Sequence, residues 1–79
     1  MKIEYHIEIY EVNDSSCVAA SYQSVTPFMA INIGDIIHGG SMNLSNTNKT
    51  VRVSDIKHII WEIEHSHIGH KLCVFTELL

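Results

Sequence analysis

Three of the six histidines stand close together, at His65, His67 and His70. The strand-like runs on either side are joined by residues 66–69, whose Gly69 can take the positive φ that a four-residue hairpin loop needs. Such a loop places His65 opposite His70, with Cβ atoms ~4.5–5.5 Å apart. Two imidazoles at that separation can share Zn²⁺ or Ni²⁺, with His67 as a third ligand. The alternative interpretation is an exposed polar tip, because no carboxylate or thiolate completes the set at a fixed spacing.

The two cysteines are the other candidates for chemistry. Cys17 and Cys73 fall in strand-like runs with no adjacent histidine or cation in sequence to lower a thiol pKa, so we expect buried, reduced thiols. Residues 34–41 have the spacing of a phosphate-binding loop, but Gly40 occupies the position of the lysine that must reach the phosphates. We therefore predict no catalytic or cofactor-binding residue and do not expect an enzyme.

The histidine cluster depends on a long β-hairpin over residues 51–79. Apolar residues alternate along 59–63 with the period of two that a strand requires, and residues 71–78 supply the partner strand. The predicted opposing pairs are Ile60–Phe75, Trp61–Val74, Glu62–Cys73 and Glu64–Lys71. This register makes Trp61→Ala the most damaging single substitution expected, at ~3–5 kcal/mol.

An α-helix over residues 55–67, within an α+β fold, is the competing interpretation of the same stretch. Its four isoleucines also recur with the helical spacing i, i+3, i+4 and i+7, with Ser54 as a cap and Gly69 as a stop. The β-branched content favours the strand. A helix would also leave residues 71–78 without a partner.

The clearest strand signal lies near the start of the chain, where apolar and polar residues alternate from Ile3 to Ile9. Residues 13–16 are all turn-forming types, and residues 17–25 again place apolar side chains on one side. We therefore predict that the first two strands pair as a hairpin.

An apolar connection and a third strand are expected next. Pro27 ends the second strand because it cannot donate an amide, and residues 28–33 are expected to cover the core as a lid. The third strand is predicted over residues 36–44, with a bend at Gly39 and Gly40.

Together these elements predict one mainly β domain, residues 1–79, built as a strongly bent antiparallel sheet or a five-stranded barrel. The apolar connection, Ile33-Gly34-Asp35-Ile36 and the long hairpin in succession resemble SH3-like small barrels. In size and polarity rhythm the chain also resembles the small orphan proteins encoded by mobile integron gene cassettes. That resemblance implies a bacterial cytoplasmic protein that self-associates.

Composition narrows the range of partners. A 79-residue chain buries only ~60–65% of its unfolded surface, yet 46% of its residues are hydrophobic, so we expect a homo-oligomer. The expected contact residues are Phe28, Met29, Ile60 and Phe75. A net charge of -4 with scattered basic residues argues against nucleic acid. The N-terminus lacks a signal-peptide core or a membrane span, which predicts a cytoplasmic location and no membrane partner.

The leading functional hypothesis is a noncatalytic binding or interaction module that self-associates and binds a small molecule or a protein. The alternative is a metal-binding protein that uses the hairpin-tip histidines.

Overall fold

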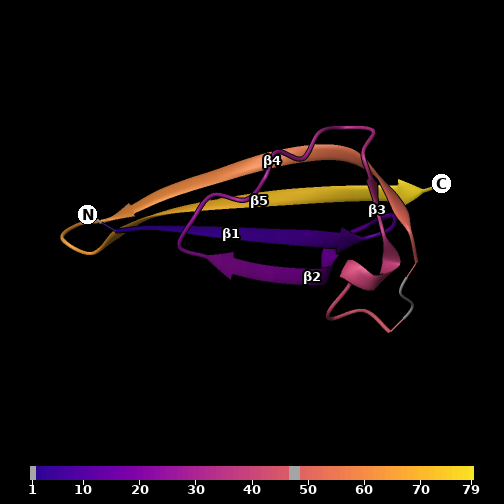
Figure 1. The fold of residues 1–79 in the computed structure, drawn as a ribbon, viewed down its shortest axis with the longest axis horizontal. Coiled ribbons are helices and arrows are strands. Elements are labelled where there is room, and N and C mark those ends of the chain that lie inside the picture. The colour runs from indigo at the N-terminus through magenta and orange to yellow at the C-terminus, as the bar shows by residue number, and fades with distance from the viewer. Residues whose placement is uncertain (1, 47–48) are drawn as a thin grey trace.

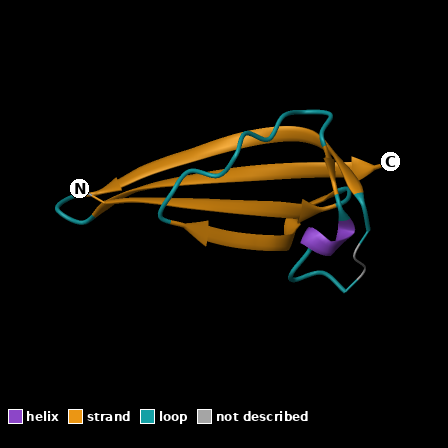
Figure 2. Ribbon diagram, viewed as in Figure 1, coloured by secondary structure: helices purple, strands orange, loops and turns teal. Residues whose placement is uncertain are grey.

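The computed structural model describes residues 2–46 and 49–79. These residues form strands β1 (Lys2–Glu11), β2 (Asp14–Ser24), β3 (Ile36–Ile37), β4 (Val51–Ile63) and β5 (His67–Leu78), and the 3₁₀ helix η1 (Gly39–Ser41). The strands make one sheet, in the order β2-β1-β5-β4-β3, that curls into a half-barrel 42 Å long (Figures 1 and 2). The mainly β prediction is confirmed, and the helix over 55–67 is excluded by β4.

Two antiparallel hairpins, β1–β2 and β4–β5, are joined through β1 and β5, which run parallel. The prediction of a wholly antiparallel sheet is therefore wrong at its centre. Ile7 and Ile9 on β1 align with Leu72 and Val74 on β5, so parallel pairing merges two apolar strand faces into one. The long connection between β2 and β4 provides the crossover that a parallel pair needs.

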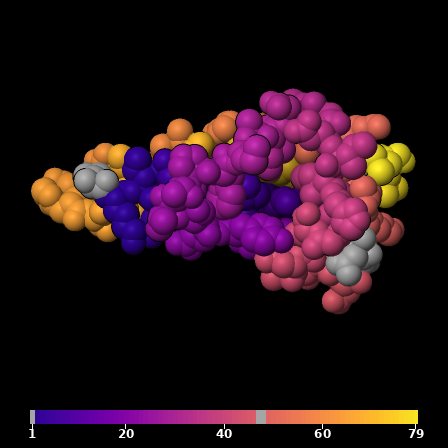
Figure 3. All heavy atoms as spheres, in the orientation of Figure 1, coloured from indigo at the N-terminus to yellow at the C-terminus, as the bar shows by residue number. Residues whose placement is uncertain are grey.

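Side chains on one face of the sheet form rows across β1, β5 and β4. The rows are Ile3–Ile68–Glu62, Tyr5–His70–Ile60, Ile7–Leu72–His58 and Ile9–Val74–Ile56. Burial increases along this series, from the exposed Ile3 and Glu62 to the buried Ile9 and Val74. Figure 3 shows the cause: the connection after β2 covers the middle of the sheet, whereas the β4–β5 turn projects beyond it.

The core lies beneath this connection. Val74 is 0% exposed and packs in one cluster with Ile7, Ile9, Ala20 and Val53. From the connection, Phe28 and Ile31 pack against the cluster, while Met29 (92% exposed) and Ile33 (65% exposed) do not. The connection therefore covers the core as predicted, although only some of its apolar residues take part.

The predicted register of the β4–β5 hairpin is wrong. The turn contains three residues, 64–66, with His65 at a φ of 62°, and Trp61 lies opposite Gly69 instead of Val74. A Cβ on Gly69 would lie 2.0 Å from the Trp61 ring, so glycine leaves the space that the indole occupies. The observed register differs from the predicted one by an odd number of residues. Residues of β4 and β5 that were predicted to share a face of the sheet therefore lie on opposite faces. Ile60 and Phe75 lie on opposite faces, and Cys73 faces Lys57 instead of Glu62.

The third strand is shorter than predicted, because Gly39 and Gly40 begin a 3₁₀ turn instead of bending a strand. Nδ1 of His38 accepts a hydrogen bond from the Gly40 N–H at 3.0 Å and so caps the turn, and Met42 then enters the core. Cys17 is exposed, which corrects its predicted burial, whereas Cys73 is buried as expected. In the described ranges, no helix has the length and apolarity to cross a membrane.

Candidate functional site

The three hairpin-tip histidines point in different directions and do not form the predicted cluster. His65 lies in the turn beside Glu64, with Nε2–Oε1 at 3.4 Å. Nε2 of His67 reaches Oε2 of Glu4 on β1 at 3.2 Å. His70 faces the other side of the sheet from His67, because their separation in the strand is odd. Among residues 2–46 and 49–79, no three His, Cys, Asp or Glu side chains are arranged to hold a metal ion.

His70 instead pairs with His58, a residue that the sequence analysis did not select. Nδ1 of His58 lies 2.9 Å from Nε2 of His70, and the two rings stack with centroids 5.2 Å apart. Tyr5 on β1 meets the edge of the His70 ring, with centroids 6.3 Å apart. The three-residue turn creates this pair, because it makes His58 and His70 diagonal neighbours on one face.

The bond between two neutral imidazoles fixes what the pair offers to other molecules. One ring must donate from its shared nitrogen and the other must accept, and each neutral ring carries one N–H. The two remaining nitrogens, Nε2 of His58 and Nδ1 of His70, are therefore one donor and one acceptor in either tautomeric arrangement. A small group that bonds to one of these nitrogens therefore meets a donor in one tautomeric arrangement and an acceptor in the other.

A cavity of about 220 Å³ adjoins the histidine pair. The sheet contributes Tyr5, His6, Leu72 and the His58–His70 pair, and the connection contributes residues 27–31. The lining is mostly apolar, with Phe28 and Ile31 also packed against the core. An apolar recess with a small polar group in its wall has the general character of a small-molecule site.

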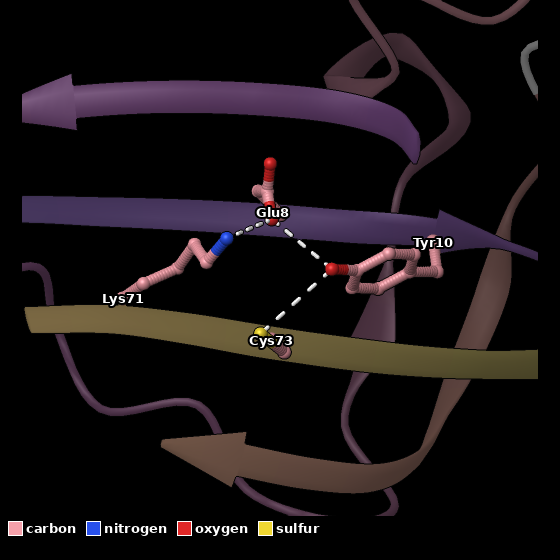
Figure 4. Close-up of polar contacts among 4 residues, drawn as sticks. All are labelled: Glu8, Tyr10, Lys71 and Cys73. Carbon is pink, nitrogen blue, oxygen red and sulfur yellow. Dashed lines mark hydrogen bonds and ion pairs between the residues drawn. The ribbon is translucent and has the colours of Figure 1, made fainter. Parts of the chain in front are cut away.

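A second polar cluster lies on the opposite face, where β1 and β5 run parallel (Figure 4). Nζ of Lys71 lies 2.9 Å from Oε1 of Glu8, and the same carboxylate oxygen accepts a hydrogen bond from the Tyr10 hydroxyl at 3.0 Å. Sγ of Cys73 lies 3.8 Å from the Tyr10 oxygen. Because the hydroxyl has one proton, it serves the carboxylate, and the thiol is the weaker partner.

The contacts in this cluster keep Glu8, Tyr10 and Lys71 in their ordinary charge states. The hydrogen bond from Lys71 lowers the pKa of Glu8, and the same bond raises the pKa of Lys71. Burial, followed by the contacts with Cys73 and Glu8, raises the pKa of Tyr10. Glu8 therefore stays charged and Tyr10 stays neutral near pH 7, which suits a structural link between two strands.

The exposed Cys17 is also poorly suited to act as a nucleophile. The negative charge of Asp14 is the main cause that raises the pKa of the Cys17 thiol, and this disfavours the reactive thiolate.

His6 has a buried ring nitrogen, Nε2, without a hydrogen-bond partner. The centroid of its ring lies 5.6 Å from that of the Trp61 ring.

The predicted contact residues occupy three places. Phe28 and Met29 line the cavity, and Ile60 is 69% exposed on β4. Phe75 stacks on Tyr10 on the other face, with ring centroids 4.9 Å apart.

No family model matches this chain, and neither does any curated protein or solved structure in the comparisons. The site geometry is therefore the basis for a functional proposal.

Proposed function

We propose that this chain is a noncatalytic, self-associating binding module that takes up a small, mostly apolar molecule carrying one hydroxyl group. The observation that carries the proposal is the His58–His70 pair in the wall of an otherwise largely apolar cavity. Residues 27–31 of the connection form the opposite wall.

The size of the cavity limits the ligand. Pockets for drug-sized molecules usually measure ~300–1,000 Å³, so a volume of about 220 Å³ suits a single ring or a short aliphatic chain. Contact with Phe28, Ile31 and Leu72 would remove apolar surface from water, at ~25 cal/mol per Å². Apolar contact thus supplies the affinity for a ligand of this size.

The histidine pair supports the choice of a hydroxyl. A hydroxyl can either donate or accept a hydrogen bond, so it can bond to the ring nitrogen that faces the cavity in either tautomeric arrangement. A carboxylate only accepts and an ammonium only donates, so each would fit only one of the two tautomeric arrangements. Phenols and short alcohols are the simplest molecules that combine this group with an apolar body.

Two further observations support a binding role over a catalytic one. The raised pKa values of Cys17 and Tyr10 keep both groups protonated, and Lys71 holds the Glu8 carboxylate. Both cysteines are free thiols, in keeping with a reducing cytoplasm. The net charge of -4 supports the absence of a nucleic-acid partner. We propose no membrane partner either.

The test is a calorimetric titration with p-cresol and with toluene, which share a ring and a methyl group and differ in the hydroxyl. We expect wild-type protein to bind p-cresol more tightly, and His70→Phe to lose that preference while keeping an aromatic ring. One hydrogen bond of ~0.5–1.5 kcal/mol corresponds to an affinity difference of about two- to tenfold.

His65→Asn is the matched control, because His65 is an exposed histidine in the turn and asparagine tolerates its positive φ. It should keep the wild-type preference for p-cresol. Equal affinity of wild-type protein for the two compounds would refute the proposal, and so would an unchanged preference in His70→Phe.

A further inference from the structure

The outer edge of β2 is covered at Ala19 and Ser21 by a segment of the same chain. Oδ1 of Asn43 accepts a hydrogen bond from the Ser21 N–H at 3.1 Å, and its Nδ2 donates to the Ser21 carbonyl oxygen at 3.0 Å. The Leu44 N–H donates to the Ala19 carbonyl oxygen at 3.0 Å. These bonds occupy backbone groups that would otherwise be available to another strand.

The outer edge of β4 is covered at one end only. β3 pairs with Val51 and Arg52, and backbone bonds of 2.8 Å join Val53 to Gly34 and Asp35. Along residues 54–63, all of them described, no further strand lies on this side. Ile60 is 69% exposed and Ile63 49% exposed in this stretch. The Ile56 N–H donates to Oδ1 of Asp55 at 2.9 Å. A strand that exposes isoleucines and has no partner strand beside it is a template for strand addition.

We propose that a second copy of this chain occupies this edge, by antiparallel pairing of the two β4 strands about a two-fold axis at Ile60. The inference rests on the self-association in the proposed function and identifies its contact surface. The two sheets would join into one continuous sheet across the interface.

Symmetry and charge select this register. A two-fold axis perpendicular to the sheet preserves its faces, so only residues separated by an even number can lie opposite each other. With the axis at Ile60, each residue of one copy lies opposite a residue of the other copy. The pairs across the interface are Ile60–Ile60, Ile59–Trp61, His58–Glu62 and Lys57–Ile63. Pairing about Ile59 or Trp61 would instead set Glu62 against an isoleucine. The Ile60 register gives each Glu62 a hydrogen-bond donor.

The pairing also adds a carboxylate to the histidine site. Glu62 of the second copy would extend the row of Ile7, Leu72 and His58, with its Cβ ~4.5–5.5 Å from that of His58. Because Nδ1 of His58 already faces His70, the carboxylate accepts from Nε2–H of His58. This fixes His58 as the acceptor for Nε2–H of His70 and leaves Nδ1 of His70 as an acceptor. The dimer thereby selects ligands whose hydroxyl donates.

Disulfide capture tests the register directly. In a Cys17→Ser background, Ile60→Cys places identical cysteines opposite each other on the two-fold axis, within reach of a disulfide. Ile63→Cys is the matched control, since it is also exposed on β4 but would face Lys57 of the second copy. With oxidised glutathione, we expect Ile60→Cys to form a covalent dimer at least tenfold faster than Ile63→Cys. Equal rates would overturn the proposal.

Light scattering on a chromatography peak tests the interface without a cross-link. At 100 µM we expect wild-type protein and Ile33→Lys to have twice the monomer mass, and Ile60→Lys to be monomeric. Ile33 is the control because it is 65% exposed, like Ile60, but lies outside the edge. A monomeric wild type, or a dimeric Ile60→Lys, would overturn the proposal. A dimer that fails to prefer p-cresol would refute the ligand and leave the dimer standing.

Discussion

Asn43 covers part of the β2 edge of the sheet with two hydrogen bonds to Ser21, whereas the β4 edge has no partner strand along residues 54–63 and exposes Ile59, Ile60 and Ile63. The exposed side chains of the two edges also differ, because Ser21 and Gln23 on β2 are polar whereas Ile60 and Ile63 on β4 are apolar. Both the cover and the side-chain chemistry thus disfavour pairing at β2 and favour it at β4. One sheet can in this way direct association to a single side.

The largest expected loss of stability comes from Gly69→Ala, which disturbs the contact between β5 and β4, the strand with the exposed edge. The added Cβ would lie 2.0 Å from the Trp61 ring, so the indole must move from its place over β5. We expect a loss of ~1–3 kcal/mol in the free energy of unfolding, measured by urea denaturation.

A double-mutant cycle with Trp61→Ala provides the control for this clash. If the ring causes the loss, Gly69→Ala should be far less harmful in the Trp61→Ala background. Additive effects would show that Gly69 is needed for its backbone and not for the space that it leaves to Trp61.

Removal of the cover from the β2 edge should have a smaller effect. Asn43→Ala eliminates the two bonds to Ser21, and we expect a loss of ~1 kcal/mol because water replaces part of each bond. Asn46→Ala is the matched control, an exposed asparagine in the same segment, and should change stability less. Light scattering should give Asn43→Ala the wild-type mass. A larger assembly would mean that the cover alone, and not the polar side chains, closes this edge.

The smallest effect concerns the Glu8–Lys71 pair, which belongs to neither edge. Because Lys71 lowers the pKa of Glu8 in the folded protein, the pair stabilises the fold above the unfolded pKa of ~4.3, and this contribution is lost as the pH falls through the lower, folded pKa. For a partly exposed pair we expect less than ~1 kcal/mol.

Urea midpoints of wild-type protein and Glu8→Gln measure this difference. The gap between them should be present at pH 7 and shrink towards pH 2, while the dimer mass at pH 7 stays the same in both. A gap that is equal at both pH values would contradict the role assigned to Glu8, and a changed mass would show that the centre of the sheet affects its edge.

Alternation of side chains predicted the strands because burial of one face imposes a period of two on the sequence, as in residues 3–9 and 59–63. Register was not predictable in the same way. A four-residue turn at 66–69 and a three-residue turn at 64–66 both fit the sequence, and the choice depends on the space that Gly69 leaves for Trp61, which is a contact across the hairpin. The damage predicted for Trp61→Ala stays a prediction, but its assumed neighbour Val74 was wrong.

The candidate site could not be predicted from the sequence either, because it also depends on the register of the β4–β5 hairpin. His70 was selected for its proximity to His65 and His67, yet its partner His58 is a diagonal neighbour only in the correct register. The apolar connection could be predicted from Phe28 and Ile31, because a run of apolar residues must cover something apolar. Its position over the histidine pair depends on the parallel pairing of β1 with β5, which no local pattern encodes.

That parallel pairing has a consequence for how the chain acquires its structure. Each hairpin can close over a short loop, but the parallel β1–β5 pairing that joins them, here called the seam, connects distant parts of the sequence. The Thr76 hydroxyl, for example, donates to the Tyr10 carbonyl oxygen across 66 residues at 2.8 Å. Closing so long a loop has an entropic cost before any contact repays it, so the seam is expected to set the folding rate. During synthesis, β1 must wait for β5, which is made after the other four strands, and its apolar face stays open to other chains until then.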